Sequence, residues 1–380
     1  SAAFVEIHTD SDIIGVGETY AGYFFPECVP GMVDFFAPIL IGQSPEDVEE
    51  LWERMYRSGN YWCRVGLGVA VINALEAALW DARGKMHGVP VYQLLGGRKH
   101  DRLPCYASGG PSNYPLDQLA AKLDFYLQLG FHGIKLGTGS FSQGTRWSSS
   151  TFADQAAEFE GSKMAFARKH VGKSVRLMLD GHMGNKPDSK PGATWDLATA
   201  TAVMKSVEPY DLFFFEEPLP YSDPWSYQEL CQATSVPIAG GECLTAMYEW
   251  RVFAEQDAFD IGQPDAAWTG GLGEFMRVAA MMESRGRKIA THAAGAGGAL
   301  MQNIHCAFAC ANTVICEVLP ALGSLHLDIA GDAFRFEKGD VLPPEKPGLG
   351  LVLTDDIKNR HPFVPGSGEF NSVPGKMLVD

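Results

Sequence analysis

The sequence of 380 residues is longer than one small core can organise, so it predicts several ordinary domains or one barrel with an attached domain. Hydrophobic residues make up 46% of the chain and charged residues 20%, a composition typical of a globular protein with a large packed interior. Lys and Arg total 30 against 46 Asp and Glu, and the net charge of -16 opposes binding to nucleic acid or to anionic membrane surfaces. A small anionic substrate is still compatible with this charge, because a divalent cation can invert the potential of a carboxylate-lined pocket.

The eight cysteines are scattered, and no two of them have Cys-x-x-Cys spacing, so we expect reduced structural thiols. Nothing in the sequence resembles a signal peptide. The longest stretch without a formal charge, 289–316, contains Gln302, Asn303 and Asn312, which are untypical of a membrane span. We therefore expect a cytoplasmic protein with neither membrane nor nucleic acid as a partner.

Three elements are predicted in the first hundred residues. Ala3 to Glu18 alternates apolar and polar residues around the acidic turn Thr9-Asp10-Ser11-Asp12, which predicts an antiparallel hairpin. Ser44 begins a helix signal, because Ser-Pro-Glu-Asp supplies an N-cap, a proline in the first turn and early acidic residues. Gly66 to Gly88 predicts a second helix that is apolar on almost every face, so it should be buried between two bodies of structure.

From Leu103 onward the sequence repeats one unit, in which a short apolar strand runs into a Gly-rich or acidic end and then into an amphipathic helix. The eight candidate strands are 103–107, 133–136, 175–179, 212–215, 237–239, 260–263, 288–290 and 314–316. Eight is the number that a closed parallel barrel requires, so the predicted fold class is α/β, a (β/α)8 barrel. From about Asp328 the sequence returns to alternating strand patterns and Pro/Gly-rich loops.

Polar side chains close most of these strands, and in such barrels the carboxyl ends of the strands carry the chemistry. Lys135 ends the second strand, Asp180 and His182 the third, Glu216 the fourth, Glu242 the fifth, Asp265 the sixth, His292 the seventh and Glu317 the eighth. Neighbouring members are separated by about one strand and helix, so all of them can converge on one mouth of the barrel.

Asp180, Glu216 and Glu242 would bring three carboxylates together, and such carboxylates repel one another unless they share a proton or a hard metal ion. Mg²⁺ fits this set best, because zinc normally recruits His or Cys and three carboxylates leave room for substrate oxygens in an octahedral shell. The alternative is that the three acids are unrelated surface or salt-bridged residues.

Five short motifs at these strand ends resemble the enolase superfamily and, within it, the mandelate racemase subgroup. They are Leu-Asp-Gly-His, Phe-Glu-Glu-Pro, Gly-Glu-Cys, Gln-Pro-Asp and Thr-His-Ala, and the resemblance covers nearly the whole chain. It implies a modified barrel at residues 101–327 and an α+β capping domain formed by residues 1–100 and completed by residues 328–380. We also expect a homo-oligomer, of an order that the sequence leaves open.

The resemblance implies one Mg²⁺ per subunit on Asp180, Glu216 and Glu242. The ion would bind a substrate carboxylate and stabilise the enediolate that forms when a base removes the α-proton. Glu216 rather than its neighbour Glu217 matches the family's ligand, and Glu217 is expected to pair elsewhere.

The other strand-end residues also match family positions. Asp265 and His292 match an Asp-His dyad in which the histidine moves the α-proton, with a core or metal-bound histidine as the alternative. Lys135 matches the first lysine of a racemase pair and would help to bind the substrate carboxylate and the developing charge, unless it pairs with a structural acid. Glu317 matches a family acid that hydrogen-bonds the substrate carboxylate.

Two departures from the racemase pattern favour loss of water over inversion of a stereocentre. Racemases of this family carry Lys-x-Lys on the second strand, whereas this chain has Lys135-Leu136-Gly137, and glycine cannot exchange a proton. His182 stands two residues beyond Asp180, where racemases tend to have Asn, and an imidazole there can protonate a leaving β-hydroxyl. This arrangement resembles the acid sugar dehydratases of the subgroup, galactonate dehydratase being the nearest pattern. The alternative is that His182 only hydrogen-bonds the substrate or another carboxylate.

The sequence therefore predicts a Mg²⁺-dependent lyase that dehydrates an aldonic or related sugar acid to a 2-keto-3-deoxy acid. A racemase, epimerase or cycloisomerase that uses the same enolate is the alternative among enzymes, and a non-catalytic sugar-acid-binding or scaffold protein is the alternative from another class. Two insertions, 139–152 with Arg146 and Trp147 and 183–193, would lengthen the rim of the site and are candidates for substrate contacts.

Overall fold

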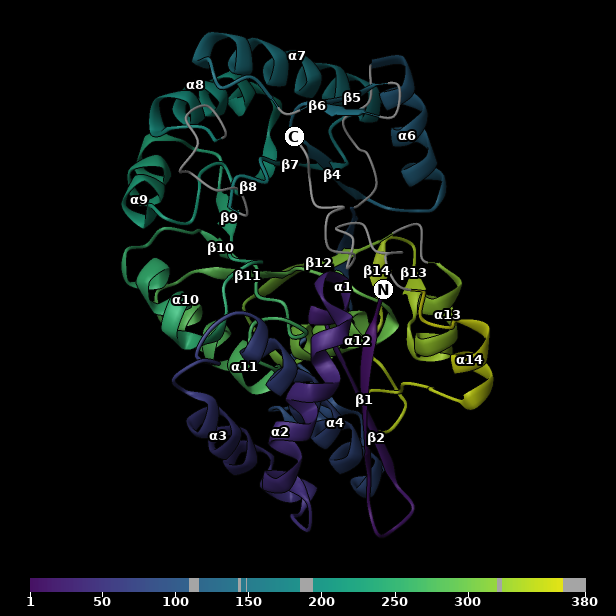
Figure 1. Cartoon of the computed structure of the whole chain (residues 1–380). Helices are drawn as coiled ribbons and strands as arrows, with labels where there is room; N and C mark the ends of the chain where they lie inside the picture. Colours follow the sequence, from purple (N-terminus) through teal and green to yellow (C-terminus); the bar gives the residue numbers. More distant parts are fainter. Residues whose placement is uncertain (109–115, 143–144, 148, 185–193, 320–322, 365–380) are drawn as a thin grey trace.

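The computed structural model describes residues 1–108, 116–142, 145–147, 149–184, 194–319 and 323–364. Within these ranges, eight parallel strands close into a barrel, and a second unit built from the N-terminal residues packs on one side of it (Figure 1). The predicted fold class is confirmed.

The barrel strands follow the chain order and close on themselves. They are β3 (Leu103–Ala107), β4 (Gly133–Gly137), β7 (Arg176–Asp180), β8 (Leu212–Glu216), β9 (Ile238–Gly240), β10 (Ile261–Gly262), β11 (Lys288–Thr291) and β12 (Thr313–Val318). Each pairs with the next, and β12 returns to β3 in parallel with Cys316 opposite Cys105. The eight predicted strands agree closely with these bounds, and most of the apolar runs stop at a charged residue or a glycine, as at Gly137, Asp180 and Glu216.

Helices cover the outside of the barrel, and several begin with the caps that their sequences favour. They are α6 (Leu116–Gln128), α7 (Ala153–Val171), α8 (Leu197–Val207), α9 (Pro224–Ala233), α10 (Ala246–Glu255), α11 (Leu272–Ser284) and α12 (Gly297–Ala309), which surround the strands in Figure 1. Asp196 caps α8 by accepting the N–H of Thr199, and Asp223 caps α9 by accepting that of Ser226. The short strands β5 (Ser140–Ser142) and β6 (Thr145–Trp147) form a hairpin before α7, and η3 (Glu208–Tyr210) leads into β8.

The barrel interior is a packed apolar core below the polar mouth. One cluster comprises Tyr106, Met178, Phe214, Ala239, Ile261, Ala290 and Ile315, a single side chain from each of seven strands. Because successive strand residues point to opposite faces, Met178 joins this cluster while Leu177 and Leu179 belong to the larger core shared with the surrounding helices. The strands are therefore largely apolar on both faces, and charged side chains such as Asp180 and Glu216 are the last residues of their strands.

The N-terminal unit begins with the predicted hairpin, β1 (Ala3–His8) and β2 (Ile14–Thr19), in antiparallel register. It continues through α1 (Ala21–Phe24), η1 (Pro26–Cys28), α2 (Val29–Leu40), η2 (Pro45–Asp47), α3 (Val48–Gly59), α4 (Leu67–His87) and α5 (Val91–Leu94). Ser44 is an N-cap as predicted, although the turn that it caps is the 3-10 turn η2, with α3 following. The helix predicted to be apolar on all faces is α4, which is buried between the hairpin and α11.

Two buried carboxylates join the N-terminal unit to the barrel by binding the N-termini of barrel helices. Glu76 of α4 accepts the N–H of Leu272 at 2.7 Å and that of the next residue at 2.9 Å, at the start of α11. Glu18 of β2 accepts the N–H of Ala296 at 2.6 Å and that of Ala299 at 2.8 Å, at the start of α12. The first N–H groups of a helix lack partners within it, and the helix dipole favours a negative group there. Burial nevertheless raises the pKa of both Glu18 and Glu76 to about 7.

The C-terminal residues contact both units. After α13 (Ser324–Ala330) and η4 (Gly331–Ala333), the short strands β13 (Phe336–Glu337) and β14 (Asp340–Val341) extend the barrel sheet, with β14 antiparallel to β3. Further on, the N–H of Leu349 donates to Asp81 of α4 at 2.7 Å, and Lys358 of α14 (Asp355–Arg360) pairs with Glu6 of β1 at 2.8 Å. C-terminal residues therefore pack on both units, and the domain boundaries placed at residues 100 and 327 stay predictions.

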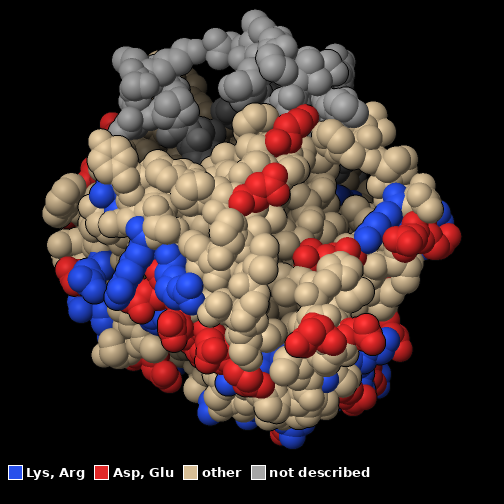
Figure 2. All heavy atoms as spheres, turned by 60° about the horizontal axis from the view of Figure 1, so that its bottom comes forward, with Lys and Arg blue, Asp and Glu red and all other residues tan. Residues whose placement is uncertain are grey.

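Charged side chains of both signs are interspersed over the face shown in Figure 2, with broad areas of uncharged residues between them. No helix in the described ranges is long and apolar enough to cross a membrane. All eight cysteines fall within those ranges and are free thiols.

Replacing Glu76 with Ala should lower the free energy of unfolding, because the first two N–H groups of α11 and the indole N–H of Trp80 lose their acceptor. Buried donors left unpaired cost about 1–3 kcal/mol each, and we expect a total loss of about 3 kcal/mol in chemical denaturation. Glu53→Ala is the matched control, because Glu53 is an exposed helical glutamate in a surface ion pair, and its loss should stay below about 0.5 kcal/mol. Equal losses in the two variants would contradict the proposed role of Glu76.

His305 of α12 is a buried histidine that joins three segments. Its Nδ1 accepts the N–H of Tyr92 at 3.1 Å, and its Nε2 lies 3.4 Å from the carbonyl oxygen of Leu349. Burial lowers the pKa of His305 to about 3. An unfolded histidine titrates near 6.5, so unfolding takes up a proton below that pH. The stability contributed by the neutral imidazole is therefore present above about pH 6.5 and is lost as the pH falls toward 3.

Replacing His305 with Gln should remove this source of acid sensitivity. The stability difference between the wild type and His305→Gln should shrink by about 2 kcal/mol from pH 7 to pH 5, which is about 1.4 kcal/mol for each pH unit below 6.5. Urea denaturation of both proteins at the two pH values measures this change. A difference that is the same at both would show that the fold does not keep the imidazole neutral.

Candidate active site

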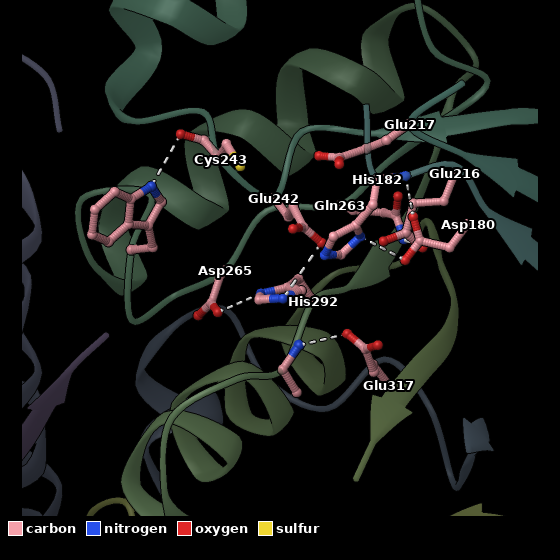
Figure 3. Close-up of polar contacts among 12 residues, drawn as sticks. Asp180, His182, Glu216, Glu217, Glu242, Cys243, Gln263, Asp265, His292 and Glu317 are labelled. Carbon is pink, nitrogen blue, oxygen red and sulfur yellow. Dashed lines mark hydrogen bonds and ion pairs between the residues drawn. The ribbon is translucent and has the colours of Figure 1, made fainter. Parts of the chain in front are cut away.

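The predicted strand-end residues gather at one mouth of the barrel. The parallel register sets Gly137 beside Asp180, Asp180 beside Glu216, and Glu216 beside Ala239. Figure 3 shows the side chains of Asp180, His182, Glu216, Glu242, Asp265, His292 and Glu317 converging from successive strand ends. Lys135 contacts three of these residues, so the structure brings all eight predicted site residues together.

Lys135 of β4 pairs with three carboxylates. Its Nζ lies 2.7 Å from Glu216 Oε1, 3.1 Å from Glu317 Oε1 and 3.3 Å from Asp180 Oδ2, and the side chain is only 5% exposed. Burial by itself would lower the pKa of Lys135, but the carboxylates raise it well above its ordinary value. The ammonium therefore stays charged and holds the ends of β7, β8 and β12 together.

His182 is held against Asp180 by two contacts. Its backbone N–H donates to Asp180 Oδ1 at 2.9 Å, and its Nδ1 lies 3.0 Å from Asp180 Oδ2. The φ of 51° at His182 belongs to the left-handed region, which turns the chain sharply after β7. Asp180 raises the pKa of His182 to about 10, against the effect of burial. The side chain remains 33% exposed, so a ligand in the mouth can reach it.

Asp265 and His292 form a buried hydrogen-bonded pair. Asp265 Oδ2 lies 2.7 Å from His292 Nδ1, while Asp265 Oδ1 accepts the N–H of Ala267 at 2.7 Å and the side-chain amide of Asn303 at 2.8 Å. Fixed on both oxygens, the carboxylate directs His292 Nε2 toward Glu242 Oε2, 3.5 Å away. Burial would lower the pKa of His292, but Glu242 and Asp265 raise it to about 10. The pair has the geometry of an oriented base that faces the mouth.

Glu216, the last residue of β8, is wholly buried between two polar partners. Its Oε1 accepts from Lys135, and its Oε2 accepts from Gln263 Nε2 at 2.6 Å. Burial raises the pKa of Glu216 well above its ordinary value, Lys135 opposes this change, and Asp180 and Glu242 add to it. A divalent cation beside these carboxylates would favour their charged forms.

Glu217 faces the mouth, which differs from the expectation that it pairs elsewhere. Tyr221 does donate to its Oε1 at 2.6 Å, but the carboxylate also lies in one group of ligand atoms with Asp180 and His182, all within 4.8 Å of one another. The φ of 43° at Glu217 turns the chain directly after β8. This turn interrupts the alternation of side chains along the strand, so two successive acids reach the same mouth.

The side chains of the mouth fit a hard divalent cation. The carboxylates of Asp180, Glu216, Glu217, Glu242, Asp265 and Glu317 outnumber the basic groups Lys135, His182 and His292 in the described part of the mouth. Glu217 Oε2 and Glu242 Oε2 are buried and lack a hydrogen-bond partner among the described residues. Buried polar atoms normally have partners, so these oxygens suit a cation that takes oxygen ligands. The predicted Mg²⁺ is compatible with this arrangement, and its ligand set of Asp180, Glu216 and Glu242 stays a prediction.

Sequence reasoning missed three residues that contact the predicted ones. Asn303 of α12 donates to the dyad carboxylate, and Gln263 donates to the last carboxylate of β8. Tyr20, directly after β2, places its ring 5.9 Å from the ring of His292. Gln263 belongs to the Gln-Pro-Asp motif, so its position was a usable signal. Asn303 and Tyr20 reach the site only through tertiary packing, which no local pattern reports.

The two predicted rim insertions are only partly described. The first contains the β5–β6 hairpin, and the side chains of Arg146 and Trp147 on β6 lie outside what the structure describes. Lys163 of α7 donates to the carbonyl oxygens of Gly137 at 2.8 Å and Gly139 at 2.9 Å, so the backbone that enters this insertion is held by a buried ammonium. The second insertion, 183–193, falls mostly outside the described residues.

Comparisons with known proteins agree with the predicted resemblance. The mandelate racemase/muconate lactonizing enzyme N-terminal domain matches residues 1–96, and the enolase C-terminal domain-like family matches residues 118–357. The D-galactonate dehydratase of Verminephrobacter eiseniae is 31% identical over 368 residues, which cover 93% of this chain and 89% of that protein. The arabinonate dehydratase of Saccharolobus solfataricus is 28% identical over 355 residues, covering 93% of this chain and 88% of that protein.

Solved structures show the same architecture over almost the whole chain. A mandelate racemase/muconate lactonizing enzyme-like protein from Roseovarius sp. has a TM-score of 0.83 and 27% identity, with 96% of this chain and 90% of that chain covered. The 3,6-anhydro-D-galactonate cycloisomerase from Zobellia galactanivorans has a TM-score of 0.80 and 27% identity, with 94% and 93% covered. As its strand-end motifs predicted, the chain belongs to the mandelate racemase/muconate lactonizing enzyme family of the enolase superfamily.

Proposed function

We propose that this protein is a Mg²⁺-dependent dehydratase of a sugar acid, which removes the α-proton, expels a β-hydroxyl and gives a 2-keto-3-deoxy acid. The relatives support a lyase of this class, since the two compared above are an arabinonate dehydratase and a D-galactonate dehydratase. An aldonic or related sugar acid is the corresponding substrate class for this chain.

The observation that carries the proposal is a pair of imidazoles in one mouth, each oriented by its own aspartate. His292 is bonded to Asp265 at 2.7 Å, and His182 lies 3.0 Å from Asp180. The negative charge of Glu242 raises the pKa of both imidazoles, so both histidines lie close to the same carboxylate. Elimination of water needs a base for the α-proton and an acid for the leaving hydroxyl, and two oriented imidazoles supply both.

Asp180, Glu216 and Glu242 would hold the Mg²⁺ ion, which when bound supplies positive charge for the substrate carboxylate and for the negative charge that develops as the α-proton leaves. The ammonium of Lys135 adds a second positive group beside the same carboxylates. Glu317 positions Lys135 at 3.1 Å, and its hydrogen bond to the substrate carboxylate stays a prediction.

The proton movements follow from the two histidines. Asp265 orients the imidazole of His292, so that Nε2 takes the α-proton of the bound acid. The electron pair of the broken C–H bond first moves onto the substrate carboxylate, and its return then forms the double bond to the β-carbon while the C–O bond there breaks. His182 gives its proton to the departing oxygen, which leaves as water, and the enol then tautomerises to the 2-keto acid.

A cycloisomerase that uses the same α-proton removal is the second candidate, because one solved relative is named a cycloisomerase. Gly137 argues against a two-base racemase, since this position on β4 has no side chain that could exchange a proton. A non-catalytic scaffold would not need a buried dyad whose carboxylate is fixed on both oxygens.

Purified protein assayed against a panel of aldonic and related sugar acids should form a 2-keto acid with at least one of them. The product should disappear when a chelator removes divalent cations and return when Mg²⁺ is added back, because the carboxylates of the mouth need a cation to hold an anionic substrate. Exchange of the α-hydrogen for deuterium without keto acid would support isomerisation instead. Neither product nor exchange would favour a binding or scaffold role.

Replacement of His292 and replacement of His182 should have different effects on keto acid formation and on α-hydrogen exchange. His292→Asn should lose both keto acid formation and α-deuterium exchange, with kcat lowered by about 10²–10⁴-fold. His182→Asn should lose keto acid formation while exchange continues, because α-proton removal uses His292. Mass spectrometry of the substrate recovered from D₂O measures the exchange.

His170→Asn is the matched control, because His170 lies on α7 in a surface ion pair with Asp124 and should leave both rates unchanged. Full dehydration by His292→Asn would show that the base is assigned wrongly. Loss of exchange in His182→Asn to the same degree as in His292→Asn would remove the distinction between acid and base.

A further inference from the structure

Three side chains of the mouth form a second group of possible ligands, and the proposed dehydration uses only one of them, Glu242. One ligand atom each of Glu217, Glu242 and Cys243 lies within 4.8 Å of the other two. Figure 3 shows Cys243 and Glu217 above Glu242, on the side of the mouth away from Glu317. Glu217 and Cys243 have no part in the proposed proton transfers, so their approach to Glu242 needs its own explanation.

An unpartnered oxygen of Glu217 indicates that a ligand binds here. Its side chain is wholly buried, and its Oε2 has no hydrogen-bond partner among the described residues, whereas its Oε1 accepts from Tyr221 at 2.6 Å. Glu242 Oε2 is also buried and lacks a hydrogen-bond partner within the same described ranges, and its nearest basic group is His292 Nε2 at 3.5 Å. A buried carboxylate oxygen without a partner is costly, and a cation bound beside Glu217 would supply the missing partner.

The side chains of Tyr221 and Trp268 hold Glu217 and the turn that carries Cys243 in place without a bound ion. The hydroxyl of Tyr221 donates to Glu217 and accepts the N–H of Gly241 at 2.5 Å, which ties the end of β8 to the turn after β9. The indole of Trp268 donates to the carbonyl oxygen of Cys243 at 3.0 Å and fixes the other side of that turn. Ligands that are already oriented lose little conformational entropy when a metal binds.

We propose that Glu217, Glu242 and Cys243 form a second cation site, which binds a thiophilic divalent ion such as Zn²⁺. Zinc accepts sulfur together with carboxylate oxygen, whereas Mg²⁺ takes oxygen ligands and has little affinity for a thiol. On binding, the Cys243 thiol releases its proton to solvent, and the thiolate sulfur bonds to the ion. The site is assigned from its own geometry and does not depend on which reaction the enzyme catalyses.

Glu242 would belong to both cation sites, since it is also a predicted Mg²⁺ ligand. A zinc ion held by Glu217 and Cys243 draws on that carboxylate and so competes with Mg²⁺ for it. Zinc at this position therefore reduces any Mg²⁺-dependent activity while leaving the fold intact.

Titration of the chelator-treated full chain with Cd²⁺, a thiophilic probe for Zn²⁺, tests the site directly. Thiolate bonded to Cd²⁺ absorbs in the ultraviolet by charge transfer, and we expect a saturable band in the wild type. Cys243→Ser should abolish this band, and Glu217→Gln should weaken the apparent Cd²⁺ affinity by about tenfold or more. Cys28→Ser is the control, because Cys28 is also a partly exposed free thiol but lies in η1 and bonds to the carbonyl oxygen of Phe25.

Absence of the band in the wild type, or its persistence in Cys243→Ser, would overturn the proposal. A second measurement uses the wild type alone and does not require any variant to fold. Zn²⁺ should slow alkylation of Cys243 by iodoacetamide, as followed by peptide mass spectrometry, while alkylation of Cys28 continues at its original rate. Equal rates at Cys243 with and without Zn²⁺ would also overturn the proposal.

Discussion

The mouth of the barrel depends on the compensation of buried negative charge. Carboxylates from successive strands converge there, and burying an uncompensated carboxylate costs more than a fold of marginal stability can bear. Three basic side chains compensate part of this charge. Lys135 pairs with three carboxylates, and His182 and His292 each face one aspartate. Glu217 Oε2 still lacks a hydrogen-bond partner within the described ranges, and so does Glu242 Oε2, which lies 3.5 Å from His292 Nε2. The excess of buried carboxylates over basic groups in the mouth therefore supports the proposed divalent cation.

In the N-terminal unit, buried carboxylates bind the N-termini of barrel helices. One of these helices, α12, also contacts the Asp265–His292 pair. Glu18 binds the N-terminus of α12, and Asn303 of the same helix holds the dyad carboxylate Asp265. The hairpin that carries Glu18 ends at Tyr20, whose ring lies against that of His292. One helix, α12, and the end of one strand, β2, therefore take part both in attaching the N-terminal unit and in orienting His292.

The sequence predicted the barrel strands and their polar ends well, because both follow from local rules. An apolar run that stops at a charged residue predicts a buried strand and its functional end at once, as at Asp180 and Glu216. The rest of the site could not be predicted in this way. Asn303 acts across the fold from the middle of a helix, and Tyr20 arrives from the other unit, so neither position follows from spacing along the chain.

Glu217 and Cys243 show a further limit, which concerns the backbone. Each directly follows a predicted ligand, and strict alternation along a strand would turn it away from the mouth. At Glu217 the φ of 43° breaks that alternation. Before Cys243 the break lies at Gly241, where φ is 114° and a Cβ would meet the ring of Trp250 at 2.2 Å, so only glycine fits. Asp180 and Glu216 are thus the last residues of their strands, whereas the turns after β8 and β9 bring a second carboxylate and a thiol into the same mouth.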